Sequence, residues 1–354
     1  MDRRTFLSAL AAWSASLTSS AAVGSRAFAQ SSSDSTPQDD HEGHDHDHDQ
    51  ELEDENPLDQ PEFAHLKEIP FKKGIPFDVV APNGSILDRF QLLKDMGFHG
   101  VEIQAPMVGY GAKAITERRT ELNDAQLNTG LKIYSVRNTY DVKYSLLSED
   151  RLERMRAMSC LRTMAVDGSI YKALIVRSSL GVVNEKNRYD DAYAFALEDL
   201  ITRFVKTLDQ AKVRLALRTA RDNFLLSPLE FRQFVHDAAH PRIGACLDPG
   251  NILPYGWPEH WTKILGDHIY SISLSNFSHD KGNKEGFQKG FNVGLLEGSC
   301  DWDRFMRSVR EVSNDMWFTY AVPPITDVNK AKYLNEEQLL DISSSMDEVL
   351  SQGV

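Results

Sequence analysis

Cysteine is scarce in this chain, with three residues in 354, Cys160, Cys246 and Cys300. Their number is odd, they lie far apart and they form no C-x-x-C pair, so the sequence does not predict a disulfide framework. Beyond the first 29 residues no run reaches 18 apolar residues, and we expect no transmembrane segment in the mature chain. A glycine-rich dinucleotide loop is also missing, because Gly109-Tyr110-Gly111 lacks a third glycine.

Residues 1–29 have the pattern of a twin-arginine signal peptide. Arg3 and Arg4 precede an apolar run from Leu7 to Leu17, and Ala27-Phe28-Ala29 supplies a small-x-small cleavage site. The alternative is an amphipathic first helix of the mature protein, but the order of charged start, apolar run and cleavage site favours the signal. It predicts export by the twin-arginine pathway to the periplasm or cell envelope.

Residues 30–60 form an acidic segment that predicts a disordered linker. They contain twelve acidic residues and no basic one. Such a composition cannot bury enough apolar surface to fold. The chain carries a net charge of −13, whereas residues 61–354 alone come to about −3. A near-neutral domain with an acidic tail repels phosphates, so we expect no nucleic-acid partner.

The linker also holds four closely spaced histidines, His41, His44, His46 and His48. Together with the carboxylates between them, they form a possible weak site for Zn²⁺, Ni²⁺ or Cu²⁺. The alternative is a solvated tether that keeps the folded domain away from the envelope.

From residue 61 onward, strand-like and helical patterns alternate. Eight apolar runs predict strands, and helical patterns follow them. The predicted strands are 76–82, 99–106, 132–138, 172–179, 213–220, 243–248, 269–277 and 316–322, and the predicted helices are 85–96, 114–128, 149–166, 190–210, 227–239, 257–265, 302–312 and 335–351. Eight such units in one domain predict an α/β fold, a (β/α)₈ TIM barrel over residues 61–354. The competing doubly wound sheet would call for the dinucleotide loop that is missing.

Polar residues gather where these strands end. The clearest case is I-G-A-C-L-D-P-G-N at 243–251, an apolar strand that stops on Asp248 and turns at Pro249-Gly250. Glu102, together with Gln104, is a polar residue of the second predicted strand. In a barrel, residues at the C-terminal ends of strands face the active site. Glu102 and Asp248 are therefore candidate catalytic residues, although Glu102 can equally well neutralise an arginine.

Four short motifs occur in order on this framework: G-F-H-G-V-E at 97–102, T-G-L-K-I at 129–133, L-D-P-G-N at 247–251, and V-G-L-L-E-G at 293–298 leading into Asp301-Trp302. In these motifs the chain resembles the xylose isomerase-like TIM barrels, which include sugar phosphate isomerases and ketose 3-epimerases. The resemblance covers essentially all of residues 61–354. It implies a sugar isomerase or epimerase.

Members of this family typically bind one divalent metal ion through a Glu, an Asp, a His and a Glu that end strands five to eight. The resemblance thus implies Mn²⁺, Mg²⁺, Co²⁺ or Zn²⁺ as cofactor. Here Arg218 replaces the first Glu, Ser273 replaces the His, and Phe318-Thr319-Tyr320-Ala321 offers no acid for the last. Asp248 is the one family ligand that remains, so we expect a degenerate metal site.

Three arginines lie near the ends of consecutive strands, Arg137, Arg177 and Arg218. One interpretation is that their guanidinium groups converge on the barrel mouth and bind a carboxylate, phosphate or sulfate. In the other, each arginine pairs with a neighbouring acid, Arg218 with Asp248 or Glu102 and Arg177 with Asp167 or Asp222.

Three further residues are candidates for binding substrate. Asn251 and Asn276 can hydrogen-bond sugar hydroxyls or simply fix turns. His279 begins a polar segment after strand seven, which is either a lid or a solvent-exposed loop.

Two functions remain open at this point. The first is an exported isomerase or epimerase with impaired or altered catalysis on a carbohydrate or sugar acid. The second is a non-catalytic protein that binds an anionic carbohydrate or a protein partner. An endonuclease role comes third, because residues 61–354 have neither the multi-histidine metal cluster nor the basic face that it requires. No oligomeric state follows from the sequence.

Overall fold

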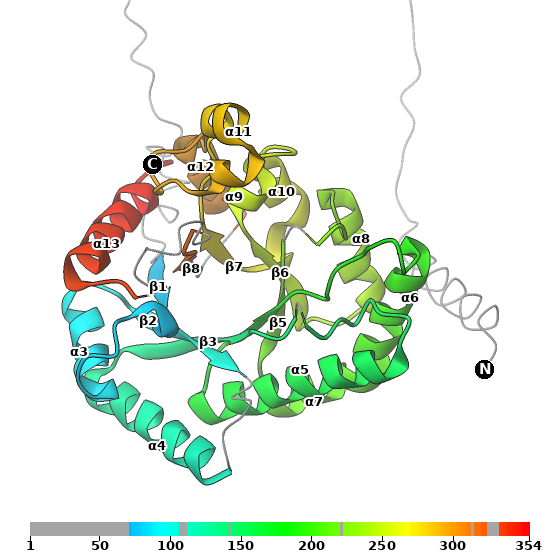
Figure 1. Cartoon of the computed structure of the whole chain (residues 1–354), viewed down its shortest axis with the longest axis horizontal. Helices are drawn as coiled ribbons and strands as arrows, with labels where there is room; N and C mark the ends of the chain where they lie inside the picture. Colours follow the sequence, from blue (N-terminus) through cyan, green and yellow to red (C-terminus); the bar gives the residue numbers. More distant parts are fainter. Residues whose placement is uncertain (1–70, 106–111, 142, 220–221, 313–314, 324–332) are drawn as a thin grey trace, which may run out of the picture. The chain divides into compact units, whose positions relative to one another are not determined.

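A computed structural model describes residues 71–105, 112–141, 143–219, 222–312, 315–323 and 333–354. Eight parallel strands follow one another around a closed barrel, and β8 pairs with β1 to complete it (Figure 1). The strands are β1 (Lys72–Pro76), β2 (Gly100–Ala105), β3 (Lys132–Asn138), β4 (Ile175–Ser178), β5 (Arg214–Arg218), β6 (Ile243–Leu247), β7 (Ile269–Leu274) and β8 (Trp317–Tyr320). The predicted TIM barrel is confirmed. The predicted signal peptide and linker lie outside the described residues.

Helices surround the barrel, and each predicted helix has its counterpart. They are α3 (Ile86–Asp95), α4 (Ala112–Thr129), α5 (Arg151–Tyr171), α6 (Tyr189–Asp199), α7 (Val205–Ala211), α8 (Pro228–Ala238), α10 (Pro258–Leu265), α12 (Trp302–Val312) and α13 (Glu336–Leu350). The π-helical turn η5 (Leu200–Phe204) joins α6 and α7, which were predicted as one helix. Shorter elements are α9 (Pro249–Ile252), α11 (His279–Glu285), η4 (Phe77–Val79), η6 (Gly266–His268) and η7 (Phe287–Phe291). None of the helices in the described ranges is long and apolar enough to cross a membrane.

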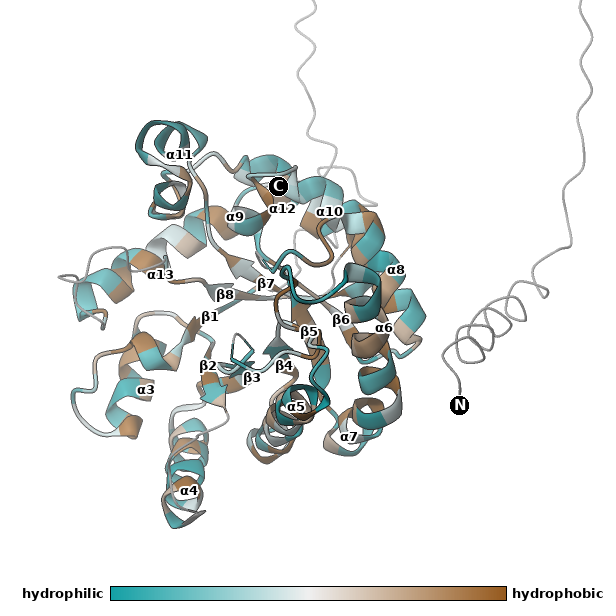
Figure 2. Ribbon diagram, turned by 45° about the vertical axis from the view of Figure 1, so that its right-hand side comes forward, coloured by the Kyte–Doolittle hydropathy of each residue, from teal (hydrophilic) through white to brown (hydrophobic). Residues whose placement is uncertain are grey.

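Helix α8 illustrates how the sequence fixes these elements. Ser227 caps its start by accepting a hydrogen bond from the backbone N–H of Glu230 at 3.2 Å, and Pro228 occupies the first turn. Phe231 and Phe234 are buried against the barrel, whereas Leu229 stays exposed. Figure 2 shows the same mixture of apolar and polar residues on the other helices, as expected for a single layer between strands and solvent.

The prediction for the first strand was wrong. It placed the strand at 76–82, whereas β1 spans Lys72–Pro76 and the turn η4 follows at once. Pro76 has no N–H to donate to a sheet ladder, so the pairing ends there. The charged pair Lys72-Lys73 concealed the true strand. Lys73 is in fact buried, with its ammonium group 2.6 Å from the Asp347 carboxylate.

Packed side chains fill the barrel interior beneath the strand ends. The fully buried ring of Tyr134 stacks on Trp317 at a centroid distance of 4.0 Å, and its hydroxyl hydrogen-bonds Thr319. A Cβ at Gly74 would lie 2.3 Å from the Tyr134 ring, so only glycine leaves room for this packing. The interior is therefore closed at this level, and a ligand can enter only from the C-terminal ends of the strands.

Candidate functional site

A cavity of about 350 Å³ opens at the C-terminal ends of the strands. Three of its lining residues are the arginines singled out from the sequence. Its polar lining residues are Asp78, Arg137, Arg177, Arg218, Asp248, Asn251, Ser273, Ser275 and Asn276. The size suits a small ligand.

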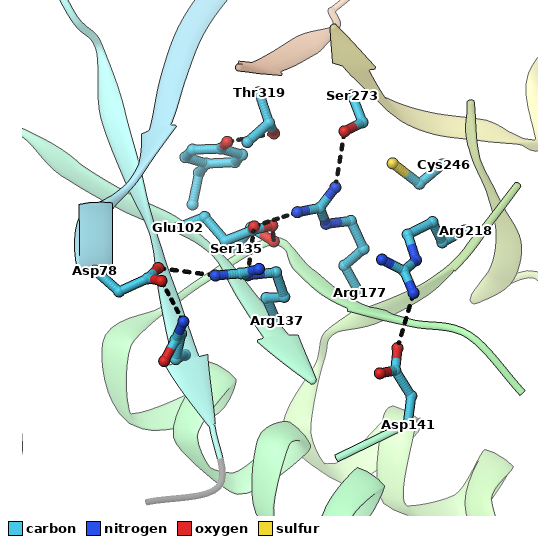
Figure 3. Close-up of polar contacts among 12 residues, drawn as sticks. Asp78, Glu102, Ser135, Arg137, Asp141, Arg177, Arg218, Cys246, Ser273 and Thr319 are labelled. Carbon is cyan, nitrogen blue, oxygen red and sulfur yellow. Dashed lines mark hydrogen bonds and ion pairs between the residues drawn. The ribbon is translucent and has the colours of Figure 1, made fainter. Parts of the chain in front are cut away.

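Glu102 lies behind the arginines at the centre of the barrel (Figure 3). Its side chain is fully buried; it accepts hydrogen bonds from Ser135 Oγ at 2.9 Å and from the Arg177 guanidinium, and it forms an ion pair with Arg137 Nε at 3.3 Å. Glu102 is not among the residues that line the cavity. The Glu102 carboxylate therefore pairs with Arg137 and Arg177 from outside the cavity lining.

Arg177 is the most deeply buried of the three arginines. One guanidinium nitrogen donates to Glu102, and Nη1 donates to Ser273 Oγ at 3.0 Å. Burial lowers the pKa of Arg177, but the adjacent Glu102 more than offsets this and holds the pKa above its usual value. The predicted pairing of Arg177 with Asp167 or Asp222 was wrong, since Asp167 instead accepts from Arg119 Nε at 2.8 Å.

The other two arginines pair with acids that the sequence analysis did not single out. Arg137 Nη2 donates to Asp78 at 2.8 Å, and Arg218 Nη2 donates to Asp141 at 3.4 Å (Figure 3). The predicted pairing of Arg218 with Asp248 or Glu102 was therefore also wrong. Asp78 follows β1, whose misplacement hid it, and Asp141 lies three residues beyond the end of β3.

Two of the three arginines nevertheless keep an unused donor. The Nε atoms of Arg177 and Arg218 are buried without a hydrogen-bond partner among the described residues, whereas Arg137 Nε lies 3.3 Å from the Glu102 carboxylate. A buried N–H without an acceptor costs about 1–3 kcal/mol. The three arginines thus converge on one cavity, as the first interpretation predicted, and each also pairs with an acid, as the second predicted, although with other acids than those named. Binding of an anion there stays a prediction.

Asp248 lies at the end of β6 and begins α9. Its carboxylate accepts from the Ser275 hydroxyl and from the Asn251 backbone N–H at 3.2 Å. Burial raises the pKa of this carboxyl, and Ser275, Asn251, Arg177 and Arg218 offset the rise only in part. Asp248 is thus a buried acid that can take up a proton at the cavity wall.

Glycine makes this arrangement possible. A Cβ at Gly250 would lie 2.2 Å from Ser275 Oγ and 2.9 Å from the Asn276 backbone. Gly250 therefore lets β7 approach α9 closely enough for Ser275 to reach Asp248.

The two asparagines both line the cavity and both fix turns. Asn251 Nδ2 donates to the Thr219 carbonyl at 3.2 Å. The Asn276 amide donates to the Leu295 carbonyl and accepts from the N–H groups of Phe277 and Cys300, at 2.7–3.0 Å. Backbone contacts therefore occupy both ends of the Asn276 amide.

His279 lies elsewhere. The polar loop predicted after strand seven is wrong, because this segment folds as α11. Ser278 caps the helix by accepting from the Lys281 N–H at 3.2 Å. The His279 ring packs on Phe277 at a centroid distance of 5.3 Å and is not among the cavity's lining residues.

Comparison with known proteins identifies the family. The sequence profile of the xylose isomerase-like TIM barrel family matches residues 90–340. The chain belongs to this family. No curated protein sequence matches it.

Several solved structures share the fold at low sequence identity. A D-psicose 3-epimerase with D-tagatose from Clostridium cellulolyticum H10 is 13% identical with a TM-score of 0.62, and the match covers 79% of this chain and 99% of that one. The apo 3-keto-D-glucoside 4-epimerase from E. coli is 12% identical with a TM-score of 0.59, and the match covers 79% of this chain and 99% of that one. A xylose isomerase domain protein from Planctomyces limnophilus is 15% identical with a TM-score of 0.59, and the match covers 78% of this chain and 95% of that one.

The family's divalent metal does not fit the residues at these strand ends. The sequence resemblance puts Arg218 and Ser273 at two of the ligand positions, and in the structure Ser273 accepts a hydrogen bond from Arg177. Thr319, on the strand that should supply the last ligand, is engaged by Tyr134. Nowhere in the described part of the chain do three His, Cys, Asp or Glu residues form a group able to hold a metal ion. With two guanidinium groups beside Asp248, a cation would be repelled.

Proposed function

We propose that this chain binds a small sugar acid or sugar phosphate in the barrel-mouth cavity and does so without a divalent metal ion. The observation that carries the proposal is the convergence of three arginines, Arg137, Arg177 and Arg218, on the lining of one cavity. Guanidinium groups are the usual protein partners of carboxylate and phosphate oxygens. The named structural neighbours, which include D-psicose 3-epimerase, act on sugars, and this supports a carbohydrate as ligand.

The charge balance of the cavity defines the ligand further. Each arginine already has an acidic partner, so the cavity offers directed N–H donors more than net positive charge. Asp248 is the additional acid. An anionic ligand beside it favours the protonated carboxyl, which can then donate a hydrogen bond to a ligand oxygen. We therefore expect acidic ligands to bind with uptake of a proton.

Altered catalysis is the second candidate, and the raised pKa of Asp248 favours it. In this alternative Asp248 removes a proton from a carbon beside a carbonyl group and returns it, while the arginines stabilise the oxyanion that forms. Glu102 is less suited to this role, because Arg177, Arg137 and Ser135 hold it outside the cavity lining.

The N-terminal sequence adds a location. We propose that residues 1–29 direct export by the twin-arginine pathway to the periplasm or cell envelope. Arg3→Lys/Arg4→Lys should retain the protein in the cytoplasm. Export of this variant at the native level would contradict the proposal.

Binding is tested by titrating the full chain calorimetrically with glucuronate, galacturonate and glucose 6-phosphate, each beside its neutral sugar. Deuterium exchange at the carbon beside the carbonyl, followed by NMR, separates the two candidates. Incorporation that Asp248→Asn abolishes indicates catalysis, and binding without incorporation indicates a binding protein. Failure of every acid to bind contradicts the proposal.

A further inference from the structure

A second cavity, of about 450 Å³, adjoins the barrel mouth. It lies between the segment that follows β5 and the segment joining α9 to α10. Its apolar and aromatic lining residues include Leu225, Leu226, Tyr255, Trp257 and Trp261. We refer to it as the aromatic groove. Asn251 lines both this groove and the arginine-lined cavity, so the two lie next to each other.

Several large apolar side chains of the aromatic groove are exposed to solvent. Tyr255 is 70% exposed, Trp257 61% and Leu226 58%. Large exposed apolar side chains that line one groove are typical of a surface that binds a ligand or a partner. Trp257 also contacts the His260 ring at a centroid distance of 5.5 Å, which holds the indole at the groove wall.

Polar groups accompany the rings. Asn223, Ser227 and His260 line the same groove. A ligand that covers aromatic faces while reaching such groups has both apolar C–H faces and hydroxyls, and this combination is the chemistry of a sugar ring. A purely apolar ligand would leave the polar groups unpaired.

The backbone beside the groove is strained in the way common at binding sites. Asn223 and Leu225 both adopt positive φ, 54° and 52°. For leucine this conformation costs about 1 kcal/mol or more, so the surrounding contacts must impose it. The Tyr189 hydroxyl does so in part by accepting from the Leu225 N–H at 2.9 Å.

We infer that the ligand of this protein is a glycoside of at least two units, with the acidic sugar on the arginines and a second sugar ring on Trp257 and Tyr255. The inference rests on the proposed function, because it extends the same site. It names a disaccharide or longer acidic saccharide, rather than a free sugar acid, as the substrate class.

The test compares three probes by calorimetry on the full chain: glucuronosyl-β-1,4-glucose, glucuronate and cellobiose. The disaccharide acid should bind at least tenfold more tightly than glucuronate, and Trp257→Ala should abolish that advantage while leaving glucuronate affinity unchanged. Leu229→Ala is the matched control, since Leu229 is 58% exposed on α8 but outside the groove. It should change neither affinity.

The outcomes are distinguishable. Equal affinities for glucuronate and the disaccharide acid overturn the inference and leave the proposed function standing. A galacturonate-containing pair is run in parallel, and absence of binding by every acid overturns both. If instead the native chain self-associates in sedimentation and Trp257→Ala makes it monomeric, the groove is a protein interface and the inference is wrong.

Discussion

The Arg177 guanidinium on β4 donates a 3.0 Å hydrogen bond to Ser273 Oγ on β7, three strands away around the barrel. In the resemblance that the sequence carries, Ser273 takes the position of the family's metal-binding histidine. A side chain from three strands away therefore brings a fixed positive charge to this strand end. The ion pair with Glu102 holds the Arg177 guanidinium group in this position.

Removing Arg218 should weaken acid binding without unfolding the protein. Its side chain is 31% exposed, and it pairs with Asp141 at 3.4 Å. We expect Arg218→Gln to lower affinity for an acidic sugar about tenfold or more, since a hydrogen bond to a charged group contributes about 1.5–3 kcal/mol. Calorimetry measures this. Arg188→Gln, at an exposed pair with Asp190, is the control and should bind normally.

Removing Arg177 should cost stability instead. Arg177→Met leaves the buried Glu102 with only Arg137 as a cationic partner, at 3.3 Å. Breaking a buried pair in this way costs about 3–5 kcal/mol in the free energy of unfolding, as urea denaturation would show. Arg188→Met should leave the free energy of unfolding close to that of the native protein, because that pair is exposed.

A double variant checks the cause. Arg177→Met/Glu102→Leu removes both charges and should be less destabilised than the sum of the two single variants. Additive costs would mean that the two groups do not stabilise each other.

The raised pKa of Asp248 predicts a specific pH dependence of stability. Between its usual value and the raised value, the unfolded chain has released its proton while the folded chain retains it, so rising pH lowers the free energy of unfolding. The Asp248→Asn variant has no carboxyl group at this position, so its free energy of unfolding does not fall with pH for this reason. Its stability relative to the native protein should therefore increase from about pH 4 towards neutral pH.

The control variant, Asp190→Asn, should show the opposite dependence of stability on pH. The hydrogen bond from Arg188 lowers the pKa of Asp190, so Asp190→Asn should lose stability relative to the native protein as pH rises from acid towards neutral. Parallel pH profiles for the native protein and Asp248→Asn would show that Asp248 titrates normally.

Replacing Gly250 by alanine should produce a steric clash, and the same replacement at the nearby Gly256 serves as its control. Gly250→Ala places a Cβ 2.2 Å from Ser275 Oγ and should cost about 1–3 kcal/mol, because the backbone of Asn276 on the other side leaves little room to move. Gly256, six residues on, has no heavy atom within 4 Å of such a Cβ. Thermal denaturation should show Gly256→Ala near the native protein, and equal shifts for both would contradict the packing argument.

Metal binding gives a further prediction. With His41, His44, His46 and His48 replaced by asparagine, the full chain should bind no stoichiometric Mn²⁺, Co²⁺ or Zn²⁺ in equilibrium dialysis. One tightly bound ion that Asp248→Ala removes would show that the strand ends still form a metal site.

The sequence predicted the barrel because eight apolar runs separated by helical patterns have few other solutions. It failed at β1, where Lys72 and Lys73 interrupt the apolar pattern at the end of the barrel opposite the site. Ion-pair partners could not be read from sequence either. Arg137 and Arg177 are register partners on β3 and β4, whereas Arg177 reaches past β3 to Glu102 on β2. Such contacts depend on the stagger and tilt of the closed barrel, which short sequence patterns do not encode.

The most direct test of the account is a calorimetric titration of the full chain, extensively dialysed against chelator, with glucuronate and with glucose. The account predicts that the acid binds in the absence of any divalent ion, that glucose does not, and that Arg218→Gln weakens the acid about tenfold or more. Equal binding of acid and neutral sugar, or binding of the acid only after Mn²⁺ is restored, would contradict it.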